Sequence, residues 1–553
     1  MNDRWLPHLE NAIPPSGQGN RISAYTISLE GWRRGLDLSF YSEFTEKGDR
    51  LLRYKLTGFG RTHEFQLSMG DKVTQEAFDI CKDKALTKEY LMKGNVPVPI
   101  GRTFLEDATI NEMIKYANSI GYPVVIKPKD SNAGKGVFAN IQNEKELIHI
   151  INHVRNDLGF TKIVLEEFVS GRECRVYVLD NRVIAAMYRV PANIKGDGEK
   201  TIEQLIKKKN KERKLNPHLS KRLIVIDEEI KQNLKEQGYQ LTDILEKGKV
   251  LYLRMKSNLS QGGDAVDNTD ELHPNVAEIA INAGKAIPGL IHYGVDIIIN
   301  EEGNHGVVLE VNTRPGLGGH LFPGKGIARD VPKEIIDFYF PETKGFEINN
   351  FYFDFDSVVE SLSKRTAREV NFLKCPRGIK FGKKYLLESN LPKSVLNKKI
   401  IPKIKSHKLH GFINFTSGDH IVLVVSSTNK NDVDLFTNFL YTMENLIVID
   451  EIDWDKPVKI GFEVIDEYSG ISKAEIKNLM SKEKKLKRAN KQNIKLKNKL
   501  SRVEKQVTDL EDELEKTKQT LMELEKKYLS VINSRSWRYT GYFRKLNKYF
   551  SKR

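Results

Sequence analysis

The chain has 553 residues, of which 39% are hydrophobic and 29% are charged, and its formal net charge is +15. A chain of this length and composition holds two or three hydrophobic cores, which argues against a single domain. Its three cysteines exclude a disulfide framework, and no pair of them has the spacing of a metal site.

Residues 1–75 consist of short apolar runs broken by Gly and Pro, and they predict only a small mixed segment. The N-terminus has no basic stretch followed by an apolar run, and eighteen apolar residues never occur in succession. We therefore expect a cytoplasmic protein.

Residues 76–343 alternate helix-period stretches with compact β-branched runs, for example VVIK at Val124, IVLEEFV at Ile163 and GVVLEVN at Gly306. This pattern predicts an α+β enzyme core. Residues 345–466 predict a second unit, in which the strand-like runs GFINFT and HIVLVVSS flank a turn and DVDLFTNFLYTM forms a helix.

Residues 471–532 predict a coiled coil, because apolar residues recur there at alternating spacings of three and four. The seam includes Leu500, Val503, Val507, Leu510, Leu514, Leu521, Leu524, Tyr528 and Val531. Asn493 falls at an a position, where a buried Asn fixes the register of a dimer. We expect a homodimer through this helix; the alternative is a long, solvated charged helix.

Residues 533–553 form a tail in which aromatic residues alternate with Arg and Lys. From residue 471 to the end the chain has 24 Lys and Arg against 10 Asp and Glu, so nearly all of the net charge lies there. Such a mixture suits an anionic membrane surface or a polyanion. A nucleic acid is the less favoured partner, because acidic runs such as EDELE interrupt the charge.

The stretch VVIKPKDSNAGKGV, residues 124–137, places Lys127 at the end of a strand and then opens into a loop of small residues. Backbone N–H groups in such a loop approach phosphate oxygens closely, and a lysine in it adds positive charge. The loop residues concerned are Asn132, Gly134, Lys135 and Gly136. A plain hairpin turn is the alternative for this loop on its own.

The stretch VLEEFVSGREC, residues 164–174, fits the adenosine part of a nucleotide. We expect a strand edge at Glu166, Phe168 and Val169 whose backbone pairs with adenine, and Glu173 to accept the ribose hydroxyls. The alternative is a surface strand with solvated acids.

Three oxygen donors occur in apolar strands further along the chain: Asp296 in GVDIII, then Glu310 and Asn312 in VVLEVNTRPG. Glu310 and Asn312 lie two apart, so they share one face of a strand. Isolated carboxylates are costly beside apolar neighbours, which argues for a compensating cation. Donors that are all oxygen indicate Mg²⁺, with Mn²⁺ as the alternative.

These segments, in this order, resemble the ATP-grasp superfamily, and most of all the branch of cyanophycin synthetase and bifunctional glutathione synthetase. The resemblance covers roughly residues 83–341 and includes DKALTKEYLMKGNVPVP and YLRMKSNLSQGGDAVDNTDELHP. It implies an ATP-grasp fold and an ATP- and Mg²⁺-dependent ligase that joins a carboxylate to an amine through an acyl phosphate.

The resemblance also implies roles for single residues. Lys84 and Lys127 would contact the α and β phosphates, and Lys135 the γ phosphate. Arg254 would stabilise the transferred phosphoryl group, so that Arg254 and Lys135 are the catalytic candidates. The acceptor-site candidates are Asn258, Ser260 and Arg314, and Arg314 suggests an acidic substrate unless it is an ordinary surface residue.

Residues from about 372 to 465 resemble acylphosphatase more weakly, and imply an α/β sandwich of ferredoxin-like type. The family's working arginine falls on Gly382 and its asparagine on Phe415, so we expect no hydrolase activity. Lys383 and Asn414 lie one position away and are the alternatives.

The terminal SRSWRYTGYFRKL resembles a short motif of bacterial cell-envelope assembly proteins. Together with the basic tail, this motif suggests the hypothesis of a ligase at the inner face of the membrane that acts on an envelope polymer or its precursor. The resemblance to the ligase family implies amino-acid or peptide-like substrates. A nucleotide-binding pseudoligase that serves as a scaffold is the competing function. The charged insertion at residues 207–248 is left open as a lid or as surface decoration.

Overall fold

The computed structural model describes residues 5–44, 50–129, 136–415, 420–465, 507–508 and 510–550. The chain divides into two compact units, residues 1–466 and 467–553. Among the described helices, none combines the length and the apolarity that a membrane crossing needs.

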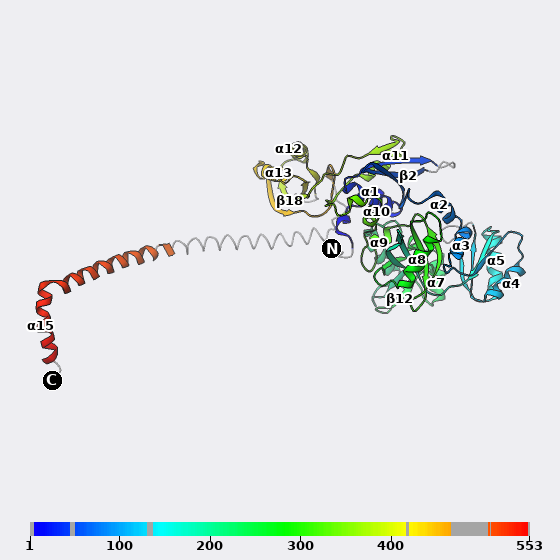
Figure 1. The fold of residues 1–553 in the computed structure, drawn as a ribbon, viewed down its shortest axis with the longest axis horizontal. Helices are drawn as coiled ribbons and strands as arrows, with labels where there is room; N and C mark the ends of the chain where they lie inside the picture. The colour runs from blue at the N-terminus through cyan, green and yellow to red at the C-terminus, as the bar shows by residue number, and fades with distance from the viewer. Residues whose placement is uncertain are drawn as a thin grey trace. The chain divides into compact units, whose positions relative to one another are not determined.

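The N-terminal part builds a five-stranded sheet in the order β17-β1-β2-β3-β4. Its outer strand comes from residues 369–371, so the chain returns to this sheet after a long excursion. The elements are α1 (Ile22–Arg33), β1 (Asp37–Phe44), β2 (Arg50–Gly58), β3 (Arg61–Gln66), β4 (Met69–Gly70), α10 (Val331–Tyr339), α11 (Phe355–Ser363) and β17 (Glu369–Asn371). One hydrophobic core joins residues from both stretches, and Figure 1 shows α1, β2 and α11 side by side.

A four-stranded antiparallel sheet follows, in the order β5-β8-β6-β7. Its elements are β5 (Gly101–Phe104), α4 (Ile110–Ile120), β6 (Val124–Pro128), β7 (Phe138–Ile141), α5 (Glu144–Asn152) and β8 (Ile163–Glu167). The helices α4 and α5 complete its core with side chains such as Met113, Ala117 and Leu147.

A second five-stranded sheet has the order β13-β10-β9-β14-β15. Its elements are α2 (Gln75–Lys82), α3 (Lys84–Lys93), β9 (Arg172–Leu179), β10 (Arg182–Val190), β13 (Asp264–Asp267), α8 (Pro274–Lys285), β14 (His292–Ile299), β15 (Gly306–Asn312) and α9 (Gly318–Leu321). Alternation along the strands sends Val176, Val295 and Val311 into a core with α2, α3 and α8. The opposite face therefore carries the polar side chains of the strands.

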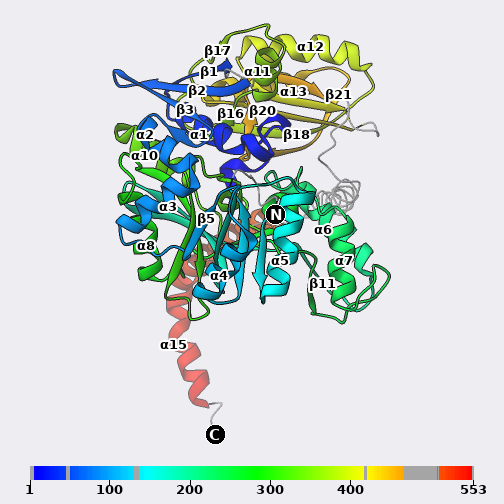
Figure 2. The ribbon, with the colours of Figure 1, turned by 90° about the vertical axis from the view of Figure 1, so that its right-hand side faces the viewer.

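An inserted unit lies between β10 and β13. It comprises β11 (Asn193–Lys195), α6 (Ile202–Leu215), α7 (Glu228–Glu236) and β12 (Val250–Tyr252). It has its own small core, which includes Ile202, Leu234 and Leu251. Figure 2 shows α6, α7 and β11 together at one side of the molecule.

The last part of the first unit contains a five-stranded sheet in the order β21-β18-β20-β19-β23. Its elements are β18 (Phe381–Ser389), α12 (Lys393–Ser406), β19 (His410–Phe415), β20 (His420–Ser427), α13 (Lys430–Thr442), β21 (Leu446–Asp453) and β23 (Phe462–Ile465). The strands β16 (Phe351–Tyr352) and β22 (Val458–Lys459) pair beside it. The first four long strands follow a βαββαβ order, and β23 is added parallel to β19.

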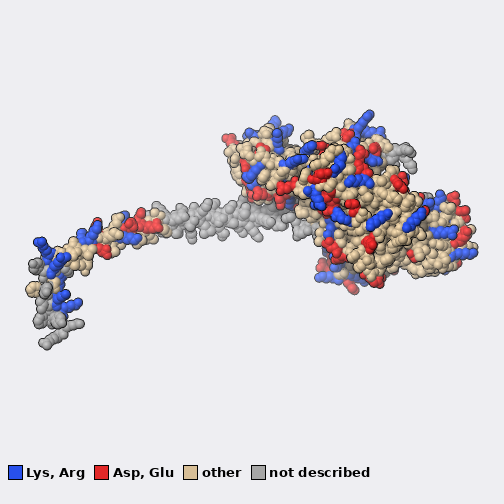
Figure 3. Space-filling view, in the orientation of Figure 1, with Lys and Arg blue, Asp and Glu red and all other residues tan. Residues whose placement is uncertain are grey.

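The second unit is helical where it is described, over residues 510–533 and α15 (Arg535–Phe550). Residues 471–506 and 509 of the expected coiled coil, Asn493 included, lie outside the described residues. The charges differ between the two helical stretches: α15 has Arg and Lys but no acid, whereas residues 510–533 carry both signs, as Figure 3 shows.

Candidate active site

A cavity of about 310 Å³ lies where α3, the four-stranded sheet and β15 meet. This volume is at the lower end of the range of small-molecule sites, about 300–1,000 Å³. Charged side chains from α3 and three strands line it, among them Lys84, Lys88, Lys127, Glu166 and Glu310. Three of the expected nucleotide residues and one expected metal ligand therefore share one cavity, although 226 positions separate Lys84 from Glu310.

Glu166 forms the centre of the charged group. It is 5% exposed on β8 and its side chain pairs with that of Lys127, which lies two residues along the neighbouring strand β6 from the residue opposite Glu166. Lys88 Nζ lies 3.6 Å from the second oxygen of Glu166, and it is buried without a hydrogen-bond partner. Burial lowers the pKa of Lys88, although Glu166 opposes the shift. Two ammonium groups around one carboxylate leave a net positive charge, which suits an anionic ligand.

The strand-edge expectation for the adenine contact was wrong for residues 163–167. The strand β8 is an inner strand, and Glu166 pairs with Gly101 of β5 on one side and with Val125 of β6 on the other. The Phe168 N–H donates to the Pro123 carbonyl at 3.0 Å. Phe168 and Val169 lie beyond the end of β8, in the connection to β9.

The three predicted oxygen donors lie together on the polar face of the second sheet. Asp296 of β14 stands directly opposite Glu310 of β15 in the strand register. With its amide oriented to satisfy its neighbours, Asn312 donates to Glu310 Oε1 and accepts from Arg175 Nη2, each at 3.3 Å. This arrangement is consistent with the prediction that the three residues lie close together.

Two arginines neutralise Asp296, which is 5% exposed. Arg175 binds both of its oxygens, at 2.6 and 2.7 Å, and Arg189 Nη1 lies 3.2 Å from Oδ2. Burial opposes ionisation of Asp296, but the charges of Arg175 and Arg189 outweigh it and lower the pKa of Asp296.

The donor set fits a hard divalent cation. A carboxylate offers about four lone-pair sites, and the arginines use three of those on Asp296. Glu310 reaches the cavity and makes no ion pair with any described residue. The described ranges contain no group of three or more His, Cys, Asp or Glu side chains that is placed for a metal. A cation here would therefore be held by two carboxylates and one amide.

Glu173, the expected ribose ligand, lies on the same polar face. Arg189 Nη1 donates to it at 2.6 Å, and the Ser257 hydroxyl donates to its other oxygen. Glu173 is thus linked through Arg189 to Asp296, so that the ribose and metal candidates form one network.

The remaining candidates are placed less uniformly. Asn132, Gly134 and Lys135 lie outside the described residues. Gly136 adopts a φ of +70°, and a Cβ there would come within 2.8 Å of Pro128. The position therefore requires glycine, as the loop interpretation expects.

Among the catalytic and acceptor candidates, Arg254 is 4% exposed and is paired with Asp227 and Glu229 rather than lining the cavity. Asn258 Nδ2 lies 3.5 Å from Gln261 Oε1, and Ser260 follows in a short helical turn. Arg314 is exposed, with its guanidinium 4.9 Å from the centre of the Phe78 ring. The roles of these residues stay predictions.

The sequence analysis missed Lys88, Arg175 and Arg189. Lys88 lies one helical turn after Lys84, so both face the same side of α3, and only burial distinguishes them. Arg175 lies two residues after Glu173 on β9, so both side chains point to the same face of the strand. This spacing could have identified Arg175 from the sequence.

Comparison with known proteins gives consistent matches over this region. Residues 81–317 match the ATP-grasp domain family. The cyanophycin synthetase of Trichormus variabilis is 36% identical over 301 residues, which are 53% of this chain and 33% of that protein. The bifunctional glutathione biosynthesis protein of Clostridium perfringens is 32% identical over 336 residues, 58% of this chain and 41% of that protein.

Among solved structures, the bifunctional glutathione synthetase from Pasteurella multocida is 26% identical, with a TM-score of 0.42, over 55% of this chain and 42% of that one. The chain thus spans about a third to two fifths of the length of the relatives it matches.

Proposed function

Because residues 81–317 form an ATP-grasp domain, we propose that the chain is an ATP- and Mg²⁺-dependent ligase that joins a carboxylate to an amine. ATP-grasp ligases form amide or peptide bonds with ATP and Mg²⁺. The observation that carries the proposal is the shared cavity, in which Lys88, Lys127 and Glu166 face Glu310.

In this proposal the lysines bind the nucleotide phosphates. Lys127 and Lys88 approach from a strand and a helix, and Glu166 holds both ammonium groups in place. Glu173 accepts the ribose hydroxyls and Val169 meets the adenine. Lys84 contacts the α and β phosphates with Lys127, Lys135 and its glycine loop bind the γ phosphate, and Arg254 stabilises the transferred phosphoryl group.

Asp296, Glu310 and Asn312 would hold the Mg²⁺. When bound there, Mg²⁺ would neutralise phosphate charge during transfer of the γ-phosphoryl group to the substrate carboxylate. Glu310 contributes an oxygen donor at the cavity wall, and Asn312 fixes its position through their hydrogen bond. Arg175 and Arg189 keep the buried Asp296 ionised, so that the site is prepared for a cation.

The substrates belong to the amino-acid and peptide class, as the names of the relatives suggest for those proteins. We assign the chain to the branch of cyanophycin synthetase and bifunctional glutathione synthetase. Arg314, Asn258 and Ser260 are our acceptor-site residues, and the exposed cation of Arg314 favours an acidic substrate.

The test is Mg²⁺-dependent ADP release by the purified protein with the twenty amino acids, singly and in pairs. We expect Glu310→Gln to lower this activity by about a hundredfold or more, because the neutral amide weakens the cation site. Glu301→Gln, an exposed carboxylate in the turn before β15, is the matched control and should leave it unchanged. Equal rates for wild type and Glu310→Gln would contradict the assignment.

The competing function is a nucleotide-binding scaffold without ligase activity. The salt bridges of Arg175 and Arg189 favour it, since they compensate Asp296 without any metal. Nucleotide binding that is the same with and without Mg²⁺, and no ADP release with any substrate, would support the scaffold.

We further propose that residues 345–466 are an acylphosphatase-like module that serves in packing or acyl binding. The βαββαβ order with its fifth parallel strand supports this. Gly382 stands where a catalytic arginine would be needed, and a Cβ there would come within 2.5 Å of the Trp454 carbonyl.

Finally, we propose that the second unit dimerises the protein and that its basic tail brings the ligase to the inner face of a membrane. Exposed Phe543 between basic residues on α15 supports the membrane contact. Co-sedimentation with phosphatidylglycerol vesicles should then require residues 533–553, and equal sedimentation without them would refute the contact.

A further inference from the structure

The loop of residues 254–264 lies between the inserted unit and the candidate active site. It carries the acceptor candidates Asn258 and Ser260, and Ser257 in it binds Glu173. We propose that the inserted unit is the scaffold of this loop: Arg213 holds one end and Asp227 with Glu229 the other, so that Ser257 is positioned against Glu173. The inference depends on the proposed function only for the role given to Glu173.

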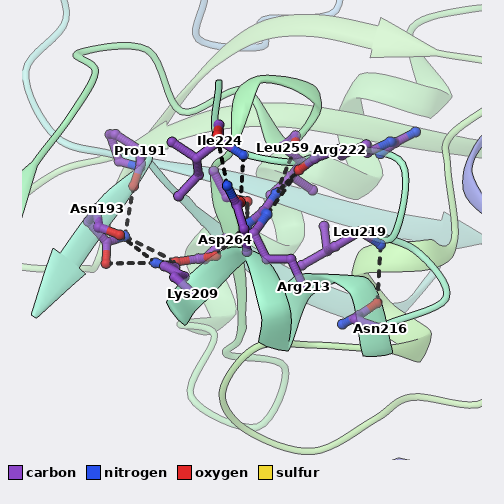
Figure 4. A network of polar contacts seen from close by, with 12 residues as sticks. Pro191, Asn193, Lys209, Arg213, Asn216, Leu219, Arg222, Ile224, Leu259 and Asp264 are labelled. Carbon is purple, nitrogen blue, oxygen red and sulfur yellow. Dashed lines mark hydrogen bonds and ion pairs between the residues drawn. The ribbon is translucent and has the colours of Figure 1, made fainter. Parts of the chain in front are cut away.

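Arg213 of α6 is 3% exposed, and its guanidinium uses all five N–H donors. Nε and Nη2 donate to the Arg222 carbonyl at 2.9 and 2.7 Å, and Nη2 also to the Leu259 carbonyl at 3.4 Å. Nη1 donates to the Gly263 carbonyl at 3.1 Å and to Asp264 Oδ1 at 2.9 Å. Figure 4 shows the hydrogen bonds around Arg213. One side chain therefore binds three carbonyls, two of them in the loop, and the Asp264 carboxylate at the end of the loop.

The same end is tightly packed. Gly262 has a φ of +101°, and a Cβ there would come within 2.7 Å of Ile224 in the inserted unit. A Cβ on Gly263 would meet the Asn258 carbonyl at 2.9 Å. Lys209, one turn before Arg213 on α6, adds a second cation at 2.5 Å from Asp264. This end of the loop is thus fitted to α6.

The other end of the loop is held by charge. Arg254 Nη2 lies 2.5 Å from Asp227, and its Nη1 binds Glu229. Asp227 also caps α7, since it accepts the Ile230 N–H at 3.1 Å. The pairing therefore ties Arg254 to the first turn of a helix.

Between these two anchors the loop reaches the active site. Ser257 follows Arg254 by three residues, and its hydroxyl donates to Glu173. Glu173 in turn accepts from Arg189, which lies 3.2 Å from Asp296. The backbone of the loop, held by the inserted unit at both ends, thus connects that unit to Glu173 and through Arg189 to the candidate metal ligand Asp296. We assign Arg213 as a positioning residue, because it binds the loop and the Arg222 carbonyl but none of the candidate nucleotide or metal residues.

The experiment measures amide hydrogen exchange in Arg213→Lys and in Arg222→Lys, using the full chain. Lysine keeps the charge beside Asp264 but cannot bind three carbonyls at once, so exchange in residues 254–264 should rise about tenfold or more. Arg222→Lys is the matched control. Its side chain contacts His218 and Asn20, not the loop, and the loop should exchange as in the wild type.

A second variant covers the case that Arg213→Lys does not fold. Asp227→Asn with Glu229→Gln leaves the shape of α7 intact but releases Arg254, and exchange should rise in residues 254–258. Unchanged exchange in the loop would overturn the inference, and so would an equal rise in the strands at residues 292–312. MgADP protection of residues 163–173 in the wild type reports nucleotide binding separately. Its absence would count against the ligase and leave the scaffold inference standing.

Discussion

At the scale of single residues, the ability of the cavity to bind an anion depends on how its charged side chains are paired. Glu166 faces two ammonium groups, and only that of Lys127 forms a close ion pair with it. A buried ammonium that lacks a hydrogen-bond partner is costly unless a ligand supplies one. Lys88 therefore has more to gain from a bound phosphate than an exposed lysine has.

We predict that Lys88→Met weakens binding of MgADP about tenfold to a hundredfold, since hydrogen bonds to charged groups contribute about 1.5–3 kcal/mol each. Isothermal titration calorimetry measures the change. Lys93→Met is the control on the same helix, because Lys93 is exposed and bonds Glu89 at 2.7 Å. An unchanged Kd for Lys88→Met would show that the phosphates lie elsewhere.

The sequence indicates which residues belong to this site better than it indicates which side chains they pair with. Glu310 and Asn312 were predicted to share a face because alternation along a strand is a local property. The pairing of Asp296 with Arg175 joins residues 121 positions apart, and it follows from the register of β9 and β14, which no local pattern encodes. For the same reason the contacts of Arg254 with α7 were not predictable.

At the scale of elements, strand order was the least predictable feature. The β-branched runs at Val124, Ile163 and Gly306 were correctly read as strands, and they became β6, β8 and β15. The strand β8 was expected at an edge, but β5 covers it. Gly101 permits this close approach, since a Cβ there would come within 2.4 Å of Glu166 Cβ.

The module formed by β18–β23 allows a prediction about activity. Of the two side chains that lie next to the missing catalytic positions, Lys383 is paired with acids and Asn414 is buried. Lys383 lies 2.9 Å from Glu451 and 3.0 Å from Asp453, and these contacts raise its pKa. Asn414 is 2% exposed, so it is not presented to a substrate in solution.

We therefore expect the full-length protein to hydrolyse acetyl phosphate no faster than its Lys383→Met variant does. Phosphate release at neutral pH measures both rates. Faster hydrolysis by the wild type, lost in Lys383→Met but kept in Lys384→Met, would show instead that this module is an acylphosphatase.

At the scale of the whole molecule, the helix of the second unit has a row of apolar side chains that are exposed to solvent. Leu510, Leu514, Leu521 and Leu524 are each between 57% and 63% exposed. Glu513 and Lys518 occupy g and e positions of successive heptads, where they attract each other across a parallel, in-register dimer. A second copy of the chain would therefore bury the leucines of the seam and pair the charges beside them.

We predict that Leu521→Asp shifts the protein from dimer to monomer at micromolar concentration. Burying one leucine contributes about 1.5–3 kcal/mol, and a dimer loses two of them, so the dimer Kd should rise more than about a hundredfold. Sedimentation equilibrium gives the mass directly. Met522→Asp is the matched control, because Met522 lies next to Leu521, is 63% exposed and faces away from the seam.

A chain shortened to residues 1–466 shows whether the coiled coil or the first unit carries the dimer interface. If the coiled coil carries the dimer, this chain is a monomer that melts at the same temperature as the first transition of the full-length protein, since residues 1–466 form a compact unit by themselves. If it stays a dimer, the first unit carries the interface. The seam would then be free for a different helix, and Leu521→Asp would leave the mass unchanged.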